Sequence, residues 1–252
     1  MNRSKIEWCD YTWNPAPGCW GPGGTAEKPN RCSYCYAHKL ANRFYGPQIT
    51  GSGQDWNLDA FGPHFYPERL DQPAKVKKPS RIFVCSMGDL FGDWVPREWI
   101  LTIKRIATEQ WVESPLGDKR LYAVTYGAPR HTFIFLTKNP TRYAEFNPWP
   151  DNCWLGTTVT NQHDMGERGH WLRKADARIK FISFEPLMGP ISMGLIDWGF
   201  QWFIIGAMTG PGAVKPEIRW SQRLVNQATE ARVPLFLKDN LNWSVKIQEF
   251  PA

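Results

Sequence analysis

The chain has 252 residues and a formal net charge of +6, from 30 basic and 24 acidic residues. A chain of this length can fold as one large α/β domain with a complete core, so we expect a single domain over residues 1–252. No stretch approaches the roughly 20 apolar residues of a membrane-spanning helix, and residues 1–13 lack the apolar core of a signal peptide. These features predict a cytoplasmic protein without a membrane partner. The mild basic excess permits a polyanionic partner without requiring one.

Short apolar segments alternate along the chain with segments of helical periodicity. The predicted strands are Tyr11–Asn14, Ile82–Cys85, Phe133–Leu136, Trp154–Val159, Lys180–Phe184, Phe203–Ile205 and Leu235–Leu237. The predicted helices are Ser33–Phe44, Pro96–Glu113, Thr141–Phe146, Asp164–Ala175 and Glu217–Arg232. This alternation predicts a mostly parallel sheet. Six or seven such units in this length favour a partial or complete (β/α) barrel over an open doubly wound sheet.

Three cysteines, Cys19, Cys32 and Cys35, follow the first predicted strand, and the last two form a Cys-x-x-Cys pair at the start of a helix. Cysteines in a chain without a secretion signal favour metal ligation over disulfides. Three cysteine ligands suit an iron–sulfur cluster whose fourth iron stays open to a substrate or cofactor. Four suit a closed structural zinc site. Cys9 lies ten residues before Cys19 and could supply a fourth thiolate, so the pattern leaves both kinds of site open.

A long insertion, at about residues 46–79, separates the first predicted helix from the second strand. It is rich in Gly and Pro and carries Trp56, Phe61, Phe65 and Tyr66. Ordered loops of this length are uncommon unless they have a function, so the insertion is a candidate lid over a site. The alternative is a surface insertion packed by its own aromatic side chains.

Polar residues stand at or just after the ends of the predicted strands. Those of most interest are Asp89, Lys138, Thr158, Glu185 and Lys238. Catalytic groups of barrels gather at the C-terminal ends of several strands, so we expect these side chains to meet on the face that carries the cysteine loop. Glu185, Lys238 and Lys138 are the candidate catalytic residues. For Lys138, a structural ion pair with an acidic neighbour is the alternative.

Segments spread over nearly the whole chain carry a resemblance to a known family. They are TWNPAPGC, CSYCYAHKLANR, IFVCSMGDLFGDWVP, FLTKNPTRY, WLGTTVTNQ, FISFEPLMGPI, WFIIGAMTGPGAVKP and VPLFLKDN. In these segments the chain resembles the phage Gp37/Gp68 family, a radical S-adenosylmethionine-like group with a three-cysteine motif. The resemblance implies a partial barrel with the three-cysteine loop after the first strand, and it says much less about the reaction.

The resemblance also implies a cofactor site. Cys19, Cys32 and Cys35 would hold a [4Fe-4S] cluster, and Tyr34 would lie near the adenine of S-adenosylmethionine. Thr158, at the predicted barrel mouth, would be a further cofactor contact. The residues that would bind the methionine amino group of the cofactor are Ser86, Met87, Gly88 and Asp89.

The chain departs from the common radical-enzyme pattern in its cysteines. Twelve residues separate Cys19 from Cys32, where common radical enzymes have three. Cys85 stands where a polar residue is expected in relatives, and Cys9 is an additional thiol. We expect neither Cys85 nor Cys153 to bind the cluster.

Together these features predict a radical S-adenosylmethionine enzyme that takes electrons from an external donor and cleaves S-adenosylmethionine reductively. The predicted substrate is macromolecular, with a nucleic acid ahead of a peptide, because the basic stretch Arg69–Arg81 and the aromatic insertion suit phosphate attraction and base stacking. A small anion is a close alternative. The alternative from another class is a zinc-stabilised nucleic-acid-binding protein without catalysis, whose ligands would be Cys9, Cys19, Cys32 and Cys35.

Overall fold

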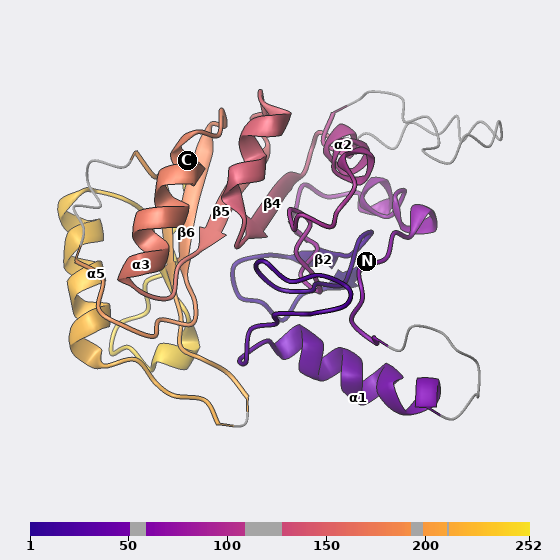
Figure 1. Ribbon diagram of the computed structural model, residues 1–252. Coiled ribbons are helices and arrows are strands. Elements are labelled where there is room, and N and C mark those ends of the chain that lie inside the picture. The colour runs from indigo at the N-terminus through magenta and orange to yellow at the C-terminus, as the bar shows by residue number, and fades with distance from the viewer. Residues whose placement is uncertain (51–58, 109–127, 193–198, 211) are drawn as a thin grey trace.

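The computed structural model describes residues 1–50, 59–108, 128–192, 199–210 and 212–252 (Figure 1). Their strands form one eight-stranded sheet in the order β1-β2-β3-β4-β5-β6-β7-β8. The strands are β1 Asn2–Arg3, β2 Tyr11–Trp13, β3 Arg81–Val84, β4 Thr132–Thr137, β5 Cys153–Thr158, β6 Ile179–Phe184, β7 Trp202–Ile205 and β8 Leu235–Leu237. The β1 strand runs antiparallel to β2, and every other neighbouring pair is parallel. The predicted α/β fold with mostly parallel strands is confirmed.

The helices lie where the periodicity predicts them, with some differences in type. They are α1 Tyr36–Thr50, α2 Arg97–Ile106, α3 Gln162–Asp164, α4 His170–Arg173 and α5 Ile218–Glu230. A π-helical turn, Met165–Gly169, joins α3 to α4, and the segment Pro140–Phe146 is a 3-10 helix. The predicted end of the second helix, at Glu113, and part of the predicted insertion lie outside the described residues. None of the described helices is long and apolar enough to cross a membrane.

The strand order distinguishes this sheet from a doubly wound one. From β2 to β8 each strand pairs with the next strand along the chain, whereas a doubly wound sheet reverses its order at one point. With right-handed crossovers, a sequential order places the connecting helices on one face of the sheet, as in a (β/α) barrel. No ladder joins β8 to β1 within the part of the chain that the structure describes. The described sheet is therefore open, with the strand order of a barrel.

The helix-covered face of the sheet carries the main core. Ile82 of β3 and Phe133 of β4 belong to the same apolar cluster as Ile103 of α2. The cluster also contains Leu235 of β8 and Ala228 of α5. All five side chains are buried. Burial of such side chains stabilises a fold by roughly 1.5–3 kcal/mol each, so this layer fixes the strands whose ends build the site.

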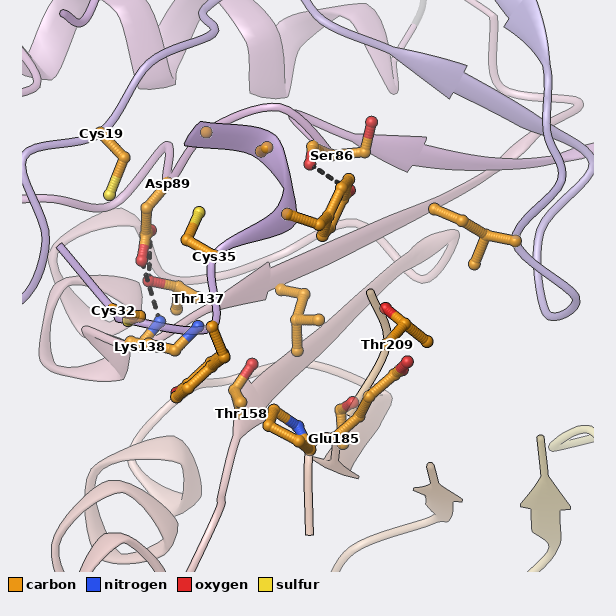
Figure 2. Close-up of a pocket in the computed structure, with 18 of the residues that line it drawn as sticks. Cys19, Cys32, Cys35, Ser86, Asp89, Thr137, Lys138, Thr158, Glu185 and Thr209 are labelled. Atoms are coloured by element: carbon orange, nitrogen blue, oxygen red, sulfur yellow. Dashed lines mark hydrogen bonds between the residues drawn. The ribbon is translucent and has the colours of Figure 1, made fainter. Parts of the chain in front are cut away.

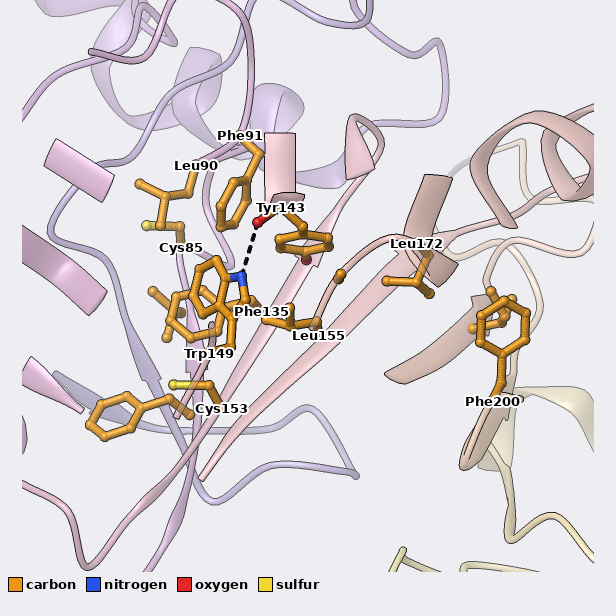
Figure 3. Packing of buried hydrophobic residues seen from close by; sticks show 14 of the residues in the cluster. Cys85, Leu90, Phe91, Phe135, Tyr143, Trp149, Cys153, Leu155, Leu172 and Phe200 are labelled. Carbon is orange, nitrogen blue, oxygen red and sulfur yellow. Dashed lines mark hydrogen bonds between the residues drawn. The ribbon is translucent and has the colours of Figure 1, made fainter. Parts of the chain in front are cut away.

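Aromatic packing fixes the end of β4 in particular (Figure 3). Phe91 and Tyr143 lie 4.5 Å apart between ring centroids, and Phe135 and Trp149 lie 5.3 Å apart. The Trp149 indole donates a hydrogen bond of 3.0 Å to the Tyr143 carbonyl oxygen. This cluster holds the segment directly after Lys138 against the sheet.

The opposite, inner face of the sheet is filled by a smaller aromatic cluster. Trp202 packs on Phe181 and Phe236, and Trp8 packs on Phe83 with a centroid separation of 4.6 Å. Trp8 lies between β1 and β2 in the sequence, so the N-terminal segment reaches across the inner face. The inner face therefore carries its own core beside the candidate site.

Candidate functional site

A cavity of about 360 Å³ lies at the C-terminal ends of the parallel strands, a volume typical of small-molecule sites. Figure 2 shows the cysteine loop and the strand-end residues around it. The predicted site residues that line it are Cys19, Cys32, Cys35, Tyr34, Ser86, Gly88, Asp89, Lys138, Thr158, Glu185 and Lys238. Met87 is the exception: it does not line the cavity itself but packs against Ala37 and Phe61, which do. The structure thus brings the predicted strand ends and the cysteine loop together.

Close backbone contacts hold the cysteine loop against the loop after β3. The Gly18 amide donates to the Met87 carbonyl oxygen at 2.8 Å, and the Cys19 amide donates to the Phe61 carbonyl oxygen at 3.0 Å. A Cβ atom on Gly88 would lie 2.6 Å from the Gly18 oxygen. Gly18 has a φ of +99°, a conformation that glycine adopts at little steric cost. These two glycines allow the approach that places the first cysteine beside the strand ends.

Two of the three cavity thiols accept backbone hydrogen bonds. The Gly21 amide donates to Cys19 Sγ at 3.2 Å, and the His38 amide donates to Cys35 Sγ at 3.4 Å. Cys35 directly precedes α1, where the first amides of a helix lack intrahelical partners. Hydrogen bonds to sulfur are one means by which proteins tune iron–sulfur clusters. The thiols and their amide donors therefore fit the ligand set of such a cluster.

The Cys19 thiol has a pKa raised to about 12, chiefly because it is buried and also because the Asp89 carboxylate is close. The Lys138 ammonium lowers the pKa, but less than burial raises it. A thiol with such a pKa stays protonated at neutral pH. A bound cation reverses this balance, because coordination by a metal deprotonates a thiol.

Asp89 organises the ends of β3 and β4. Its carboxylate accepts hydrogen bonds from Thr137 Oγ1 at 2.6 Å, from the Lys138 amide at 3.0 Å and from the Phe91 amide at 3.1 Å. These donors occupy most of the acceptor capacity of the carboxylate. Asp89 therefore holds the strand ends together and adds negative charge beside Cys19.

Lys138 and Tyr34 form the wall next to the cysteines. The Lys138 ammonium nitrogen lies 5.7 Å from the centroid of the Tyr34 ring, within the range of a cation–π contact. Burial, followed by the neighbouring Cys32 thiol, raises the pKa of the Tyr34 phenol. None of the ion pairs between described residues includes Lys138. The alternative of a structural ion pair for this lysine therefore finds no partner in that part of the chain.

Glu185 and Lys238 form an ion pair on the wall away from the cysteines. Their side chains are 23% and 12% exposed, respectively. Gly206 makes room for the pair, because a Cβ atom there would lie 2.9 Å from Lys238 Cδ. These two of the three candidate catalytic residues thus neutralise each other in the structure and present one paired unit to the cavity.

Sequence reasoning missed several cavity residues. Tyr36 lines the cavity and donates from its hydroxyl to the Ser86 carbonyl oxygen at 2.6 Å. Trp8 and Ser183 also line it. Ser183 precedes Glu185 by two residues, and alternate strand residues share a face, so the strand periodicity could have placed it there. Trp8 lies in an irregular segment between β1 and β2, so no strand or helix periodicity could have placed it at the cavity.

The remaining cysteines lie elsewhere. Cys9 packs in the inner aromatic cluster, and its thiol donates to Ser4 Oγ at 3.1 Å. Burial raises the Cys9 pKa to about 11. Cys85 and Cys153 are buried in the helix-covered core. Among the described residues, no three His, Cys, Asp or Glu side chains are close enough to hold a single metal ion.

Residues 46–50 of the predicted insertion continue α1, and the part from residue 59 onward borders the cavity. Asp59 forms an ion pair with Arg31, and Arg31 Nε donates to the Cys19 carbonyl oxygen at 2.9 Å. Phe61 lines the cavity itself. Residues 51–58 of the predicted lid, including Trp56, lie outside the described residues. The part that is described thus braces the cysteine loop.

Arginines of the predicted basic stretch make contacts within the protein. Arg69 stacks over the Tyr66 ring at 3.7 Å and donates to the Asn14 carbonyl oxygen at 3.0 Å. Arg81, the first residue of β3, forms an ion pair with Asp10. Because the cavity lies at the C-terminal ends of the strands, Arg81 stands at the opposite end of β3.

No curated protein and no solved structure matches the chain. A family model described as "Protein of unknown function (DUF5131)" matches residues 3–249. That match takes in the cysteine loop, every strand end around the cavity and nearly the whole chain, so the chain belongs to the DUF5131 family.

Proposed function

We propose that the protein is a radical S-adenosylmethionine enzyme of the Gp37/Gp68 type. The observation that carries the proposal is the placement of Cys19, Cys32 and Cys35 on one cavity at the C-terminal ends of parallel strands. Catalytic groups of barrel enzymes gather at these ends. A site with three thiols and a polar opposite wall suits an enzyme better than it suits a closed structural metal site.

The donor set fits a [4Fe-4S] cluster held by these three cysteines. A cluster binds each cysteine through a different iron atom, so its ligands need not converge on one point. A single zinc ion needs ligands at about 2.3 Å from one centre, and the described residues offer no such group. Cys9, the fourth ligand that a zinc site would need, lies in the inner aromatic cluster.

The cavity walls have complementary roles in this proposal. Bound together, a cluster and S-adenosylmethionine supply reductive cleavage of a carbon–sulfur bond and hydrogen abstraction from a substrate. Tyr34 and Lys138 would position the cofactor beside the cysteines, together with Ser86 and Thr158. The Glu185–Lys238 pair would contact the substrate. Tyr36 would close the wall between the cofactor end and the substrate end of the cavity, through the hydrogen bond from its hydroxyl to the Ser86 carbonyl oxygen.

The proposed reaction needs two partners, an electron donor and a substrate. An external electron donor is required in this proposal, because the cluster must receive one electron for each reductive cleavage of S-adenosylmethionine. We retain a nucleic acid as the proposed substrate class. The support for it is the net charge of +6 and the aromatic lining of the cavity, rather than Arg69 and Arg81, which make internal contacts.

Anaerobic spectroscopy tests the proposed function. Protein reconstituted with iron and sulfide and then reduced should give the electron paramagnetic resonance signal of a [4Fe-4S] cluster. S-adenosylmethionine should shift that signal, because an iron without a protein ligand is open to it. The matched control is S-adenosylhomocysteine, which lacks the sulfonium. A colourless protein with one zinc per chain would contradict the proposal and favour the zinc-stabilised binding protein.

A further inference from the structure

Two buried polar groups on the cavity wall have no hydrogen-bond partner. Trp8 Nε1 and Ser183 Oγ are each shielded from solvent and unpaired, and their residues are 2% and 1% exposed. Both residues line the cavity. An unpaired buried donor costs about 1–3 kcal/mol, so native proteins rarely keep one unless a ligand or water satisfies it.

The walls around these groups are apolar. Ile6, Phe83 and Leu136 line the same cavity as Trp8 and Ser183. Trp8 and Phe83 are in ring contact, with centroids 4.6 Å apart. We call these five residues the inner compartment. Such walls favour a ligand with a flat apolar surface, because aromatic side chains stack on planar rings.

None of the five residues of the inner compartment is charged. The charged groups on the adjacent wall, Glu185 and Lys238, are paired with each other. Burying a charged ligand group here without a counter-ion would be costly. The ligand group must therefore be neutral, accept a hydrogen bond from Trp8 Nε1 and form another with the Ser183 hydroxyl.

From these constraints we propose that the inner compartment binds an uncharged heteroaromatic ring, of which a nucleobase is the biological example. The ring packs against the aromatic and aliphatic walls while an acceptor atom on its edge takes the Trp8 N–H. The Ser183 hydroxyl donates to, or accepts from, a second edge atom. This inference rests on the proposed function and names the chemistry of the substrate.

Two sources can supply such a ring, and the test separates them. One is a base of the substrate, and the other is the adenine of S-adenosylmethionine. Binding of adenosine, cytidine, guanosine and uridine to the reconstituted protein is measured by calorimetry with saturating S-adenosylmethionine. Binding of S-adenosylmethionine itself is measured separately.

Two substitutions test the inner compartment. Ser183→Ala removes only the hydroxyl, and Trp8→Phe keeps an aromatic ring but removes the N–H. Each should weaken binding of the ring about five- to tenfold, the value of one hydrogen bond. Ser183→Ala should leave the melting temperature unchanged or raise it, because it removes an unpaired buried group. Trp8→Phe also loses ring volume, so only its binding is compared.

Each test variant has a control, which is the same substitution at a residue that does not line the cavity. Ser221, in α5, is 2% exposed, and Ser221→Ala should leave nucleoside affinity unchanged. Trp94 also has an unpaired buried indole nitrogen, and Trp94→Phe should likewise leave nucleoside affinity unchanged. Loss of nucleoside binding in the two test variants assigns the ring to the substrate, and loss of S-adenosylmethionine binding alone assigns it to the cofactor.

The inference is overturned if neither affinity falls in the test variants. It is also overturned if Ser183→Ala lowers the melting temperature by several degrees, since the hydroxyl would then have a structural role. Iron content is measured in the same samples. Nucleoside binding that depends on Trp8 and Ser183 without any cluster would contradict the proposed function alone, and a cluster with unchanged affinities would contradict the inference alone.

Discussion

At the scale of single residues, charge and burial divide the cavity into two unlike walls. The Cys19 thiol, with its pKa raised to about 12, lies with Asp89 and Lys138 on one side. The Glu185–Lys238 pair lies on the other. In the proposed function, a cluster or cationic cofactor would meet thiols and a carboxylate on the first wall. The paired charges of the second wall would leave selection there to shape and hydrogen bonding.

The Glu185–Lys238 pair should contribute measurably to stability. Lys238→Met or Glu185→Gln alone should lower the free energy of unfolding by about 1–2 kcal/mol, because each leaves an uncompensated and largely buried group. The double variant should lose less than the sum. Urea denaturation of the four proteins of this double-mutant cycle checks it. Strictly additive losses would show that the two side chains do not interact.

The sequence predicts cavity residues of two kinds, those of the three-cysteine motif and those whose positions follow from strand ends. Lys138 and Glu185 directly follow apolar strands, and parallel strands bring their ends to one edge. Ser183 was missed although it shares a strand face with Glu185. Trp8 could not be predicted, because nothing local indicates that an irregular segment crosses the inner face.

At the scale of elements, the cysteine loop depends on its contact with the loop after β3. Gly18 and Gly88 form an isolated parallel bridge, and neither has space for a side chain. The helix α1 begins at Tyr36, directly after the last cavity cysteine. The site therefore lies between the loop after β3 and the N-terminus of α1.

A methyl group at Gly88 should disturb this contact. Gly88→Ala would place a Cβ atom 2.6 Å from the Gly18 oxygen, so the two loops must separate, at a cost of about 1–3 kcal/mol. Thermal unfolding should show a lower melting temperature, and the reconstituted protein should retain less iron.

Gly166→Ala is the matched control, because no heavy atom outside its own helical backbone and its two chain neighbours lies within 4 Å of a Cβ atom there. It should leave both the melting temperature and the iron content near those of the unchanged protein. Equal behaviour of the two variants would show that the contact between Gly18 and Gly88 does not support the site.

Element positions followed well from the sequence, and element types followed less well. The strand Leu235–Leu237 has the predicted bounds, because apolar runs between turn residues are strong signals. The predicted helix Asp164–Ala175 instead contains the π-helical turn Met165–Gly169. The preceding turn, α3, is capped by the Asn161 side chain, which accepts a hydrogen bond from the Asp164 amide. Periodicity does not report such local shifts.

At the scale of the whole molecule, the sequential strand order explains why one site collects residues from most of the chain. Each strand from β2 onwards adds its C-terminal end beside the previous one. The order was predictable from the alternation of strands and helices. The packing of the N-terminal segment against the inner face was not, because it depends on tertiary contacts of Trp8.

The central claim is that three cysteines, and not four, form the metal site. The most direct measurement is the iron content per chain of anaerobically reconstituted single Cys→Ala variants. The unchanged protein should hold about four iron atoms per chain. The variants of Cys19, Cys32 and Cys35 should lose most of this iron, because each removes a ligand on the cavity.

The variants of the other cysteines are the controls, and they should keep the iron of the unchanged protein. They are Cys9→Ala, Cys85→Ala and Cys153→Ala. Their thiols lie in the apolar clusters on the two faces of the sheet. Full loss of iron in the Cys9 variant, together with retention in the Cys19 variant, would contradict the account.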